Sequence, residues 1–286
     1  MSEYRDGLKE NEKVEVLSGG VEVIISPSHG FGTDAMLLAD FASPRRKDLC
    51  MDFGTGCGII PMLWFRNGVQ KDIYGVDIQP LAVDQFTRSV DLTQKALATQ
   101  NEPVNTTTSN NSTDHSKDAN THLDNRLSTD DCARLHPVLA DLKDLPKDIP
   151  AGCFNVVTMN PPYKPEGDGI LSETNADQIA RHMTECTLED MCRAAARLLN
   201  FGGKFCICLR PERLVDAMEA YRKAGLEPKK LRFVQKRADT PPWLFLLEGR
   251  KGGKPFLTVQ PPLLIQGPDG RNSEELQRII GEYANN

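Results

Sequence analysis

One loop combines an amide, a phenol and two stiff residues. Asn160, Pro161, Pro162 and Tyr163 follow the short β-branched run at residues 156–158, which is typical of a buried strand. Two consecutive prolines cannot continue a sheet, because neither can donate a ladder hydrogen bond. The sequence therefore predicts a rigid loop at the end of a strand, carrying a hydrogen-bonding side chain and an aromatic ring.

This loop has the groups needed to alkylate a planar amine. The Asn160 side-chain oxygen and the Pro161 carbonyl can each accept an N–H bond, which draws the amine nitrogen toward tetrahedral geometry. The Tyr163 ring can stack on a base. Because Pro161 and Pro162 hold the loop, these groups would be in place before the substrate arrives. A plain proline turn that begins with Asn is the alternative interpretation.

A glycine-rich loop follows an earlier predicted strand. Gly54, Gly56 and Gly58 form a GxGxG pattern, which differs from the dinucleotide fingerprint GxGxxG because Ile59 follows the last glycine. Glycine allows the backbone to turn tightly and to approach a ligand closely. We therefore expect a small-molecule site at this loop.

Three carboxylates accompany this loop at strand ends. Asp52 lies just before it, and Asp77 ends the next predicted strand, 19 residues beyond Gly58. A carboxylate at that strand end can accept hydrogen bonds from both hydroxyls of a ribose. Asp141 follows a third strand and can accept from the amine of an adenine, or it can be a helix N-cap or a solvated acid.

Two cofactor classes fit a nucleoside-binding carboxylate after a glycine loop. A nicotinamide cofactor needs a binding site for its pyrophosphate. S-adenosylmethionine has no phosphate and carries a sulfonium cation, which an acidic side chain such as Asp52 would stabilise. The glycine spacing alone leaves both open. The Asn-Pro-Pro-Tyr loop, placed after the other motifs, favours S-adenosylmethionine and methyl transfer.

The elements that would position these residues alternate along the chain. A hairpin is expected at residues 13–25, followed by a helix that ends before Pro44, so that residues 1–45 form an N-terminal hairpin and helix. Strands and helices then alternate, which predicts a doubly wound Rossmann-like α/β sheet. Such sheets bind ligands beyond the carboxyl ends of their strands, so the motifs should converge on one crevice.

One segment departs from this alternation of strands and helices. Residues 99–134 are rich in Asn, Thr, Ser and Asp and poor in apolar residues, so they cannot bury enough surface to offset the entropy of ordering. We predict a disordered insertion here. Because the pattern continues on both sides, we expect a single domain over residues 1–286.

Composition narrows the class of protein further. The formal net charge is −6, but residues 201–260 carry 13 Lys and Arg against 6 Asp and Glu, which permits a local basic face. No apolar run is long enough to span a membrane, and the N-terminus is charged, so we expect a cytoplasmic protein without a membrane partner. The 8 cysteines contain no CxxC pair and have no histidine at ligand spacing, which predicts reduced structural thiols and no metal.

The motifs resemble those of the class I S-adenosylmethionine-dependent methyltransferases, and more narrowly the tRNA(Val) adenine-N6 methyltransferase family. The matching segments include HGFGTDAMLLADFA, DFGTGCGIIPML, GVDIQPLAV, ADLKDL, NPPYKPEGDG and GGKFCICLRPERL, and they span most of the chain outside residues 99–134. The resemblance implies a seven-stranded, mostly parallel sheet with an antiparallel edge strand. Met183, where relatives have Glu, and Arg271-Asn272, in place of Tyr-Thr, depart from the family pattern.

The resemblance also implies roles by position. Gly54, Gly56, Asp77 and Asp141 would hold the cofactor, Thr33 and Asp34 would close over its methionine end, and residues 160–163 would hold the acceptor amine. The activity so implied is N6-methylation of adenine in RNA, most simply tRNA, with the basic excess at residues 201–260 seating phosphates.

Other functions stay open at this point. They are methylation of a protein glutamine amide, methylation of rRNA or DNA, and cofactor binding without catalysis. The roles of His29, Arg181 and His182, the modified position and the oligomeric state do not follow from the sequence.

Overall fold

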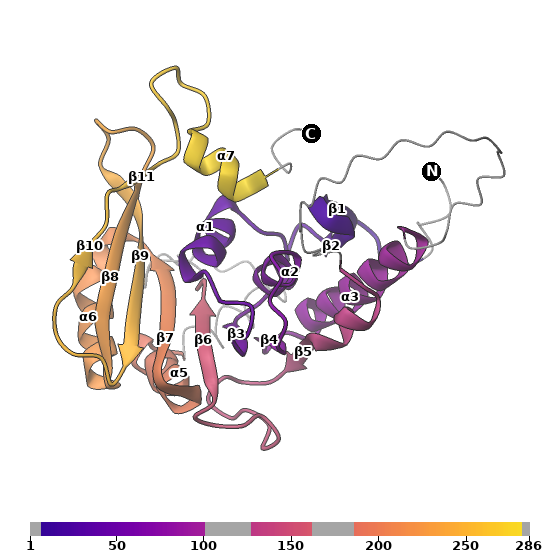
Figure 1. The fold of residues 1–286 in the computed structure, drawn as a ribbon, viewed down its shortest axis with the longest axis horizontal. Helices are drawn as coiled ribbons and strands as arrows, with labels where there is room; N and C mark the ends of the chain where they lie inside the picture. The colour runs from indigo at the N-terminus through magenta and orange to yellow at the C-terminus, as the bar shows by residue number, and fades with distance from the viewer. Residues whose placement is uncertain (1–6, 101–126, 162–185, 282–286) are drawn as a thin grey trace, which may run out of the picture.

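A computed structural model describes residues 7–100, 127–161 and 186–281 of the chain. Within them, nine strands form one sheet in the order β10-β8-β9-β7-β6-β3-β4-β5, with β11 also paired to β8 (Figure 1). The strands are β3 (Cys50–Phe53), β4 (Ile73–Asp77), β5 (Leu135–Leu139), β6 (Phe154–Met159), β7 (Leu199–Leu209), β8 (Leu226–Gln235), β9 (Pro242–Lys251), β10 (Thr258–Val259) and β11 (Leu263–Leu264). The expected doubly wound, mostly parallel α/β sheet is confirmed. The two strands beyond the seven that the resemblance implied are the two-residue strands β10 and β11, which pair with β8.

The antiparallel strand lies inside the sheet and not at its edge, where the resemblance placed it. β9 pairs antiparallel with both β7 and β8, so it separates them. The physical reason is its composition, because residues 244–247 are apolar and fully buried on both faces of the sheet. β8 alternates buried and half-exposed residues and takes the outer position, where the short β10 and β11 extend the sheet.

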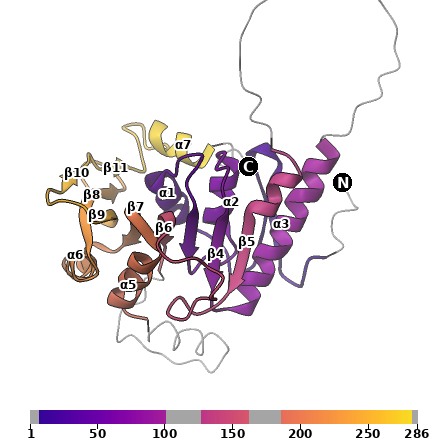
Figure 2. The same cartoon turned by 60° about the horizontal axis from the view of Figure 1, so that its bottom comes forward.

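Helices cover both faces of the sheet. One buried apolar cluster draws on α1 (Thr33–Ala42), α2 (Ile59–Arg66), α3 (Pro80–Gln100) and α7 (Glu274–Ile280). A second cluster lies on the other face, under α5 (Leu188–Leu198) and α6 (Leu214–Lys223). Figure 2 shows α1 and α7 on one side of the sheet and α5 and α6 on the other.

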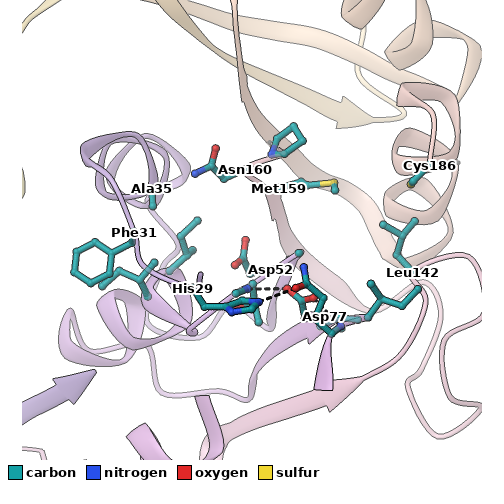
Figure 3. A pocket seen from close by; sticks show the side chains of 18 of the residues that line it. His29, Phe31, Ala35, Asp52, Asp77, Leu142, Met159, Asn160 and Cys186 are labelled. Carbon is teal, nitrogen blue, oxygen red and sulfur yellow. Dashed lines mark hydrogen bonds between the residues drawn. The ribbon is translucent and has the colours of Figure 1, made fainter. Parts of the chain in front are cut away.

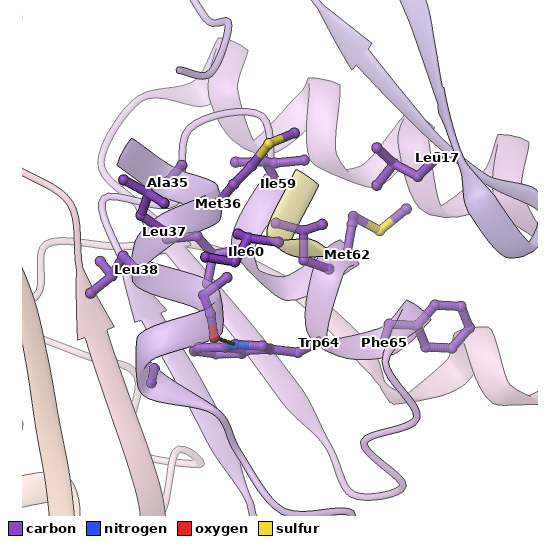
Figure 4. Close-up of a cluster of buried hydrophobic side chains, with 14 of the residues drawn as sticks. Leu17, Ala35, Met36, Leu37, Leu38, Ile59, Ile60, Met62, Trp64 and Phe65 are labelled. Carbon is purple, nitrogen blue, oxygen red and sulfur yellow. Dashed lines mark hydrogen bonds between the residues drawn. The ribbon is translucent and has the colours of Figure 1, made fainter. Parts of the chain in front are cut away.

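Helices α1 and α2 pack against each other. Trp64 of α2 is fully buried, and its Nε1 donates a hydrogen bond of 3.2 Å to the Ala39 carbonyl of α1 (Figure 4). This bond joins the C-terminal halves of the two helices, and α2 begins directly after the glycine loop.

The N-terminal hairpin packs on α3. It consists of β1 (Lys13–Leu17) and β2 (Val21–Ile25), as the sequence predicts, joined by a 3-10 turn at Ser18–Gly20. Buried hydroxyls of α3 satisfy its backbone, because Ser89 Oγ accepts from Ile24 N at 2.8 Å and Thr93 Oγ1 accepts from Glu22 N at 3.0 Å. The hairpin thus fixes the start of the segment that joins β2 to α1.

The predicted insertion, called the low-complexity segment below, is shorter than the range 99–134 that the sequence indicated. Helix α3 continues to Gln100, and a 3-10 helix at Asp130–Arg134 buries Cys132 beside the core. The ends of the predicted insertion at 99–134 therefore belong to the folded domain, because a helical turn and one apolar thiol anchor them. Residues 101–126 lie outside the described residues.

Helix α5 begins with a capping box that is readable in the sequence TLED at residues 187–190. Thr187 Oγ1 accepts a hydrogen bond from Asp190 N, and the Asp190 carboxylate accepts one from Thr187 N. These two bonds satisfy backbone N–H groups at the start of the helix.

Candidate active site

A cavity of about 380 Å³ opens beyond the carboxyl ends of β3, β4, β5 and β6. The side chains predicted from the sequence meet there: Asp34, Asp52, Gly54, Gly56, Asp77, Asp141, Asn160 and Pro161 all line it. Thr33 begins α1 next to this cavity but is not among its lining residues. Pro162, Tyr163, Arg181, His182 and Met183 lie outside the described residues.

The glycine loop has a backbone that side chains would obstruct. Gly56 has a φ of +54°, in the left-handed region, and faces open space. Gly58 has a φ of +82°, and a Cβ there would lie 2.2 Å from the Phe86 ring of α3. The loop therefore presents bare backbone to the cavity while packing closely against α3.

Asp77 ties this loop to the end of β4. Its Oδ2 accepts from Gly56 N at 2.8 Å, and its Oδ1 accepts from Gln79 N at 3.0 Å. Burial, which leaves Asp77 only 5% exposed, raises the pKa of its carboxyl, and the two backbone N–H bonds oppose that rise. A carboxylate can accept about four hydrogen bonds, so Asp77 can still bind two hydroxyls of a ligand.

Asp52 lies deeper, between Asp77 and Asn160 in the view of Figure 3. It is 2% exposed, and burial raises the pKa of its carboxyl to about 7, although a hydrogen bond of 2.6 Å from Thr158 Oγ1 favours the ionised form. A cationic group bound in the cavity would stabilise this carboxylate. Asp52 thus suits a positively charged ligand.

His29 belongs to the segment that crosses the cavity between β2 and α1. Its Nε2 is 2.7 Å from Gln79 Oε1, its Nδ1 is 3.0 Å from Ser28 Oγ, and a pair of backbone hydrogen bonds joins Ser26 and His29. Figure 3 shows His29 beside Asp77. Sequence reasoning left His29 open and missed its partner Gln79, because only the folded chain brings them together.

The acceptor side of the cavity is formed by the end of β6. Asn160 and the buried Pro161 follow Met159, and Asn160 Oδ1 accepts a hydrogen bond from Cys208 Sγ of β7 at 2.9 Å. Asp141, after β5, also lines the cavity and accepts from Lys143 N at 2.8 Å. The lining of the cavity thus combines the Asn160 amide, next to Pro161, with several carboxylates.

Apolar side chains that sequence reasoning did not select also line the cavity. They are Phe31, Ile59, Ile60, Val76, Ile78, Leu142, Met159 and Cys186. The only signal for Phe31 was its place between two glycines, Gly30 and Gly32, just before α1. A flat, partly apolar ligand with few polar groups fits such a lining.

Comparison with known proteins supports the fold and the resemblance. No family model matches the chain. It is 24% identical over 257 residues to the tRNA1(Val) (adenine(37)-N6)-methyltransferase of Dickeya chrysanthemi, covering 88% of this chain and 86% of that protein. A protein of the same name from Tolumonas auensis is 24% identical over 255 residues, covering 88% of each.

Solved structures share the architecture. A predicted O-methyltransferase from Agrobacterium tumefaciens superposes with a TM-score of 0.56 at 18% identity, covering 87% of this chain and 96% of that one. The M. jannaschii TYW2 structure in complex with AdoMet gives a TM-score of 0.50 at 12% identity, covering 85% and 87%. The chain has the class I methyltransferase fold. The resemblance drawn from the sequence motifs is therefore confirmed at the level of fold and overall similarity.

The polar groups of this methyltransferase fold suit the expected cofactor. Asp77 could hold the ribose hydroxyls, and Asp141 could accept from the adenine amine. Asp52 could face the cationic methionine end, close to the backbone of Gly54 and Gly56. The bare backbone at Gly56, where nothing lies within 4 Å of an added Cβ, leaves room for this close approach.

The basic residues at 201–260 lie on β7, α6, β8 and β9 and in the turns that connect these elements. Some are already paired, because the buried Glu248 of β9 contacts Lys230 at 3.3 Å and Arg250 at 2.8 Å. Lys230 and Arg250 keep 40% and 41% of their side-chain surface exposed, so they remain accessible to phosphates. A role in RNA binding stays a prediction.

The described parts of the methyltransferase fold contain no helix that is long and apolar enough to cross a membrane. All 8 cysteines belong to the described residues, and none forms a disulfide.

Proposed function

We propose that this protein is an S-adenosylmethionine-dependent methyltransferase that modifies the exocyclic N6 amine of an adenine in RNA, with tRNA as the substrate class. The observation that carries the proposal is the meeting of Asp52, Asp77 and Asn160-Pro161 around one cavity. Carboxylates suited to a cationic nucleoside lie on one side of it, and an amide on a proline-bounded loop lies on the other.

The cofactor would supply an electrophilic methyl group on its sulfonium. Asp77 would hold the ribose in place, and Asp52 would lie near the positive charge. Holding the donor in this way converts methyl transfer into a reaction between two fixed partners, which removes much of the entropic barrier.

Asn160 and Pro161 would act on the acceptor. The side-chain oxygen of Asn160 and the carbonyl of Pro161 would accept the two N–H groups of the amine, so that the nitrogen lone pair turns toward the methyl group. The amine becomes acidic only as the new N–C bond forms, so neither oxygen needs to take a full proton beforehand. The surplus proton then leaves to water.

The substrate class rests on the curated relatives and on charge. The relatives named above are tRNA1(Val) (adenine(37)-N6)-methyltransferases, and the basic excess at residues 201–260 gives an otherwise acidic chain a surface that phosphates could contact. An adenine in a loop is cheaper to turn out of its stack than one in a duplex. Work on tRNA would place the protein in the cytoplasm, as expected from its sequence.

The proposal is tested by incubating the protein with labelled S-adenosylmethionine and total tRNA, followed by nucleoside mass spectrometry. We expect N6-methyladenosine with the wild-type chain and none with Asn160→Ala. Parallel reactions with rRNA, DNA and a protein extract contain the competing acceptors. Label that appears only in glutamine residues or only in DNA would overturn the assignment to RNA.

A further inference from the structure

A group of charged side chains lies on the face of the sheet that carries α1 and α7. Arg250 of β9 is opposite Lys204 of β7, and Glu248 of β9 is opposite Lys230 of β8. Side chains two residues apart on a strand share a face, so Glu248 and Arg250 follow Leu246, which belongs to the apolar cluster on this side of the sheet. The face therefore changes from apolar to charged along β9.

The helices on this face leave the charged part of the strands open to solvent. In Figure 1 the face is turned toward the viewer, and no helix of the described residues lies in front of the lower parts of β7, β8 and β9. Lys230 and Arg250 accordingly keep much of their side-chain surface exposed. A large ligand can therefore reach this part of the sheet.

Glu248 is the acid at the centre of the group. It is fully buried, its Oε1 accepts from Arg250 Nε at 2.8 Å, and its Oε2 lies 3.3 Å from Lys230 Nζ. Burial raises the pKa of its carboxyl, but the hydrogen bond from Arg250 and the positive charges of Lys230, Arg250 and Lys204 outweigh burial and lower the pKa. One carboxylate thus holds the cations close together and leaves most of their charge uncompensated.

The loop between α1 and β3 continues this group of cations. Lys204 Nζ donates a hydrogen bond of 3.3 Å to the carbonyl of Ser43, the C-cap residue of α1. Arg45, Arg46 and Lys47 follow in the same loop, and all three are exposed. The hydrogen bond at Lys204 therefore joins two basic segments that are distant in the sequence.

These six cations are called the basic strip here: Arg45, Arg46, Lys47, Lys204, Lys230 and Arg250. Two acids accompany them, Asp48 in the loop and the buried Glu248, so six positive and two negative charges leave a formal charge of +4. The whole chain has a formal net charge of −6. A local positive surface on an acidic protein attracts a polyanion to that surface.

Other basic residues of the range 201–260 are differently placed. Arg232 makes two hydrogen bonds to the Glu275 carboxylate of α7. Lys223 of α6 lies on the opposite face of the sheet and forms ion pairs with Glu189 and Glu219. The strip therefore includes only part of that basic excess, and it gains three cations from a loop outside the range.

We propose that the basic strip binds the phosphate backbone of the RNA whose adenine enters the cavity. This inference rests on the proposed function and names part of the surface that would seat the substrate. Lys204 is opposite Val156 of β6, and Asn160 follows Val156 by four residues, which is about 13 Å along the strand. A nucleic-acid strand that advances about 3.4 Å per nucleotide covers this distance in about four nucleotides.

An exposed aromatic ring beside the strip favours RNA over an acidic protein as the occupant. Phe201 at the start of β7 is 85% exposed. Its ring lies against Gly252, where an added Cβ would be 2.2 Å from it, and Gly252 follows Arg250 by two residues. A base can stack on such a ring while a neighbouring phosphate contacts a cation.

The test measures binding of a labelled tRNA mixture at several salt concentrations, without S-adenosylmethionine. Each phosphate contact that is lost lowers the slope of log K against log salt by about 0.7–0.9. The loop variant Arg45→Gln/Arg46→Gln/Lys47→Gln should therefore lower the slope by about 2 to 3 and the affinity by about 10- to 100-fold. Lys204→Gln should lower the slope by about 1, and Lys204→Arg should retain it. These substitutions leave both ion pairs of Glu248 in place.

A matched variant removes three exposed cations from other surfaces. Lys95→Gln/Arg222→Gln/Lys223→Gln, on α3 and α6, changes the net charge as much as the loop variant does. Its slope should equal that of wild type. An equal loss of binding in the two triple variants would mean that binding follows net charge and would overturn the proposal. Unchanged tRNA binding by the loop variant would also overturn it, and loss of binding to polyglutamate in that variant would then identify an acidic protein as the occupant.

Binding and turnover together keep this inference apart from the proposed function. In the methylation assay the loop variant should raise KM for tRNA and leave kcat and cofactor affinity near their wild-type values. A wild-type chain that binds tRNA through the strip and methylates none of it would remove the proposed function and leave the strip as an RNA site. N6-methylation of tRNA with an unchanged KM in the loop variant would remove the strip and leave the proposed function.

Discussion

The Thr158 hydroxyl donates a hydrogen bond of 2.6 Å to the Asp52 carboxylate, and the two residues come from neighbouring parallel strands. This hydrogen bond stabilises the ionised form of the carboxyl group, whereas burial favours its neutral form. Asp52 therefore changes its charge near physiological pH, where a cationic ligand would draw it into the ionised form.

This raised pKa predicts how stability depends on pH. Asp52 shifts from 3.8 to about 7 on folding, so its contribution is fully present below pH 4 and is lost as the pH rises through 7. This difference between the unfolded and the folded pKa corresponds to about 4 kcal/mol of unfolding free energy. Relative to wild type, Asp52→Asn should therefore become more stable as the pH rises from 4 to 8, measured by urea unfolding without cofactor.

Thr158→Val serves as the partner experiment. Removing the hydroxyl donor should raise the pKa of Asp52 further. The pH-dependent loss of stability should then continue to a higher pH. A difference between wild type and Asp52→Asn that stays constant from pH 4 to 8 would contradict the assignment of this titration to Asp52.

Asp77→Ala should weaken cofactor binding. The substitution removes a carboxylate that could bind two ribose hydroxyls, and charge-assisted hydrogen bonds contribute about 1.5–3 kcal/mol, which is about 10- to 150-fold in dissociation constant. Calorimetric titration with S-adenosylmethionine measures this. Asp91→Ala, on the exposed face of α3, is the control, and equal affinities for the two variants would remove Asp77 from the cofactor site.

Asn160→Ala should lower turnover by about 10²–10³ while cofactor affinity changes little, by analogy with the loss of one preorganised oxyanion-hole donor. Asn160→Asp keeps an acceptor oxygen and should retain more activity than the Ala variant. Single-turnover methylation of tRNA ranks the variants, with cofactor binding measured separately. Normal turnover by Asn160→Ala would mean that the loop is only a turn.

The low-complexity segment offers a test by deletion. Replacing residues 101–126 with a short Gly/Ser linker should preserve the circular dichroism spectrum and turnover, because added loop length changes closure entropy only slowly. Removing residues 99–134 should cost stability, since that deletion also takes the 3-10 helix and the buried Cys132. If the shorter deletion keeps the spectrum and loses activity, the segment takes part in substrate binding.

Local chemistry was enough to predict the parts of the site that lie within one stretch of chain. A glycine at a left-handed φ, a carboxylate at a strand end and prolines that stop a strand each leave a mark on a few adjacent residues, as at Gly56, Asp77 and Asn160-Pro161. The convergence of these groups also followed from sequence, because alternating strands and helices place all the carboxyl ends of a parallel sheet at one edge. The capping box at Thr187 was predictable for the same local reason.

Tertiary structure alone decided the partners of these groups. Thr158 and Asp52 are 106 residues apart, Cys208 and Asn160 are 48 apart, and His29 meets Gln79 across 50 residues. Such contacts depend on strand order and register, and a shift of one residue would turn each side chain to the other face of the sheet. Tertiary structure also decided the position of β9 inside the sheet, because a strand's neighbours depend on which surfaces the whole domain must bury.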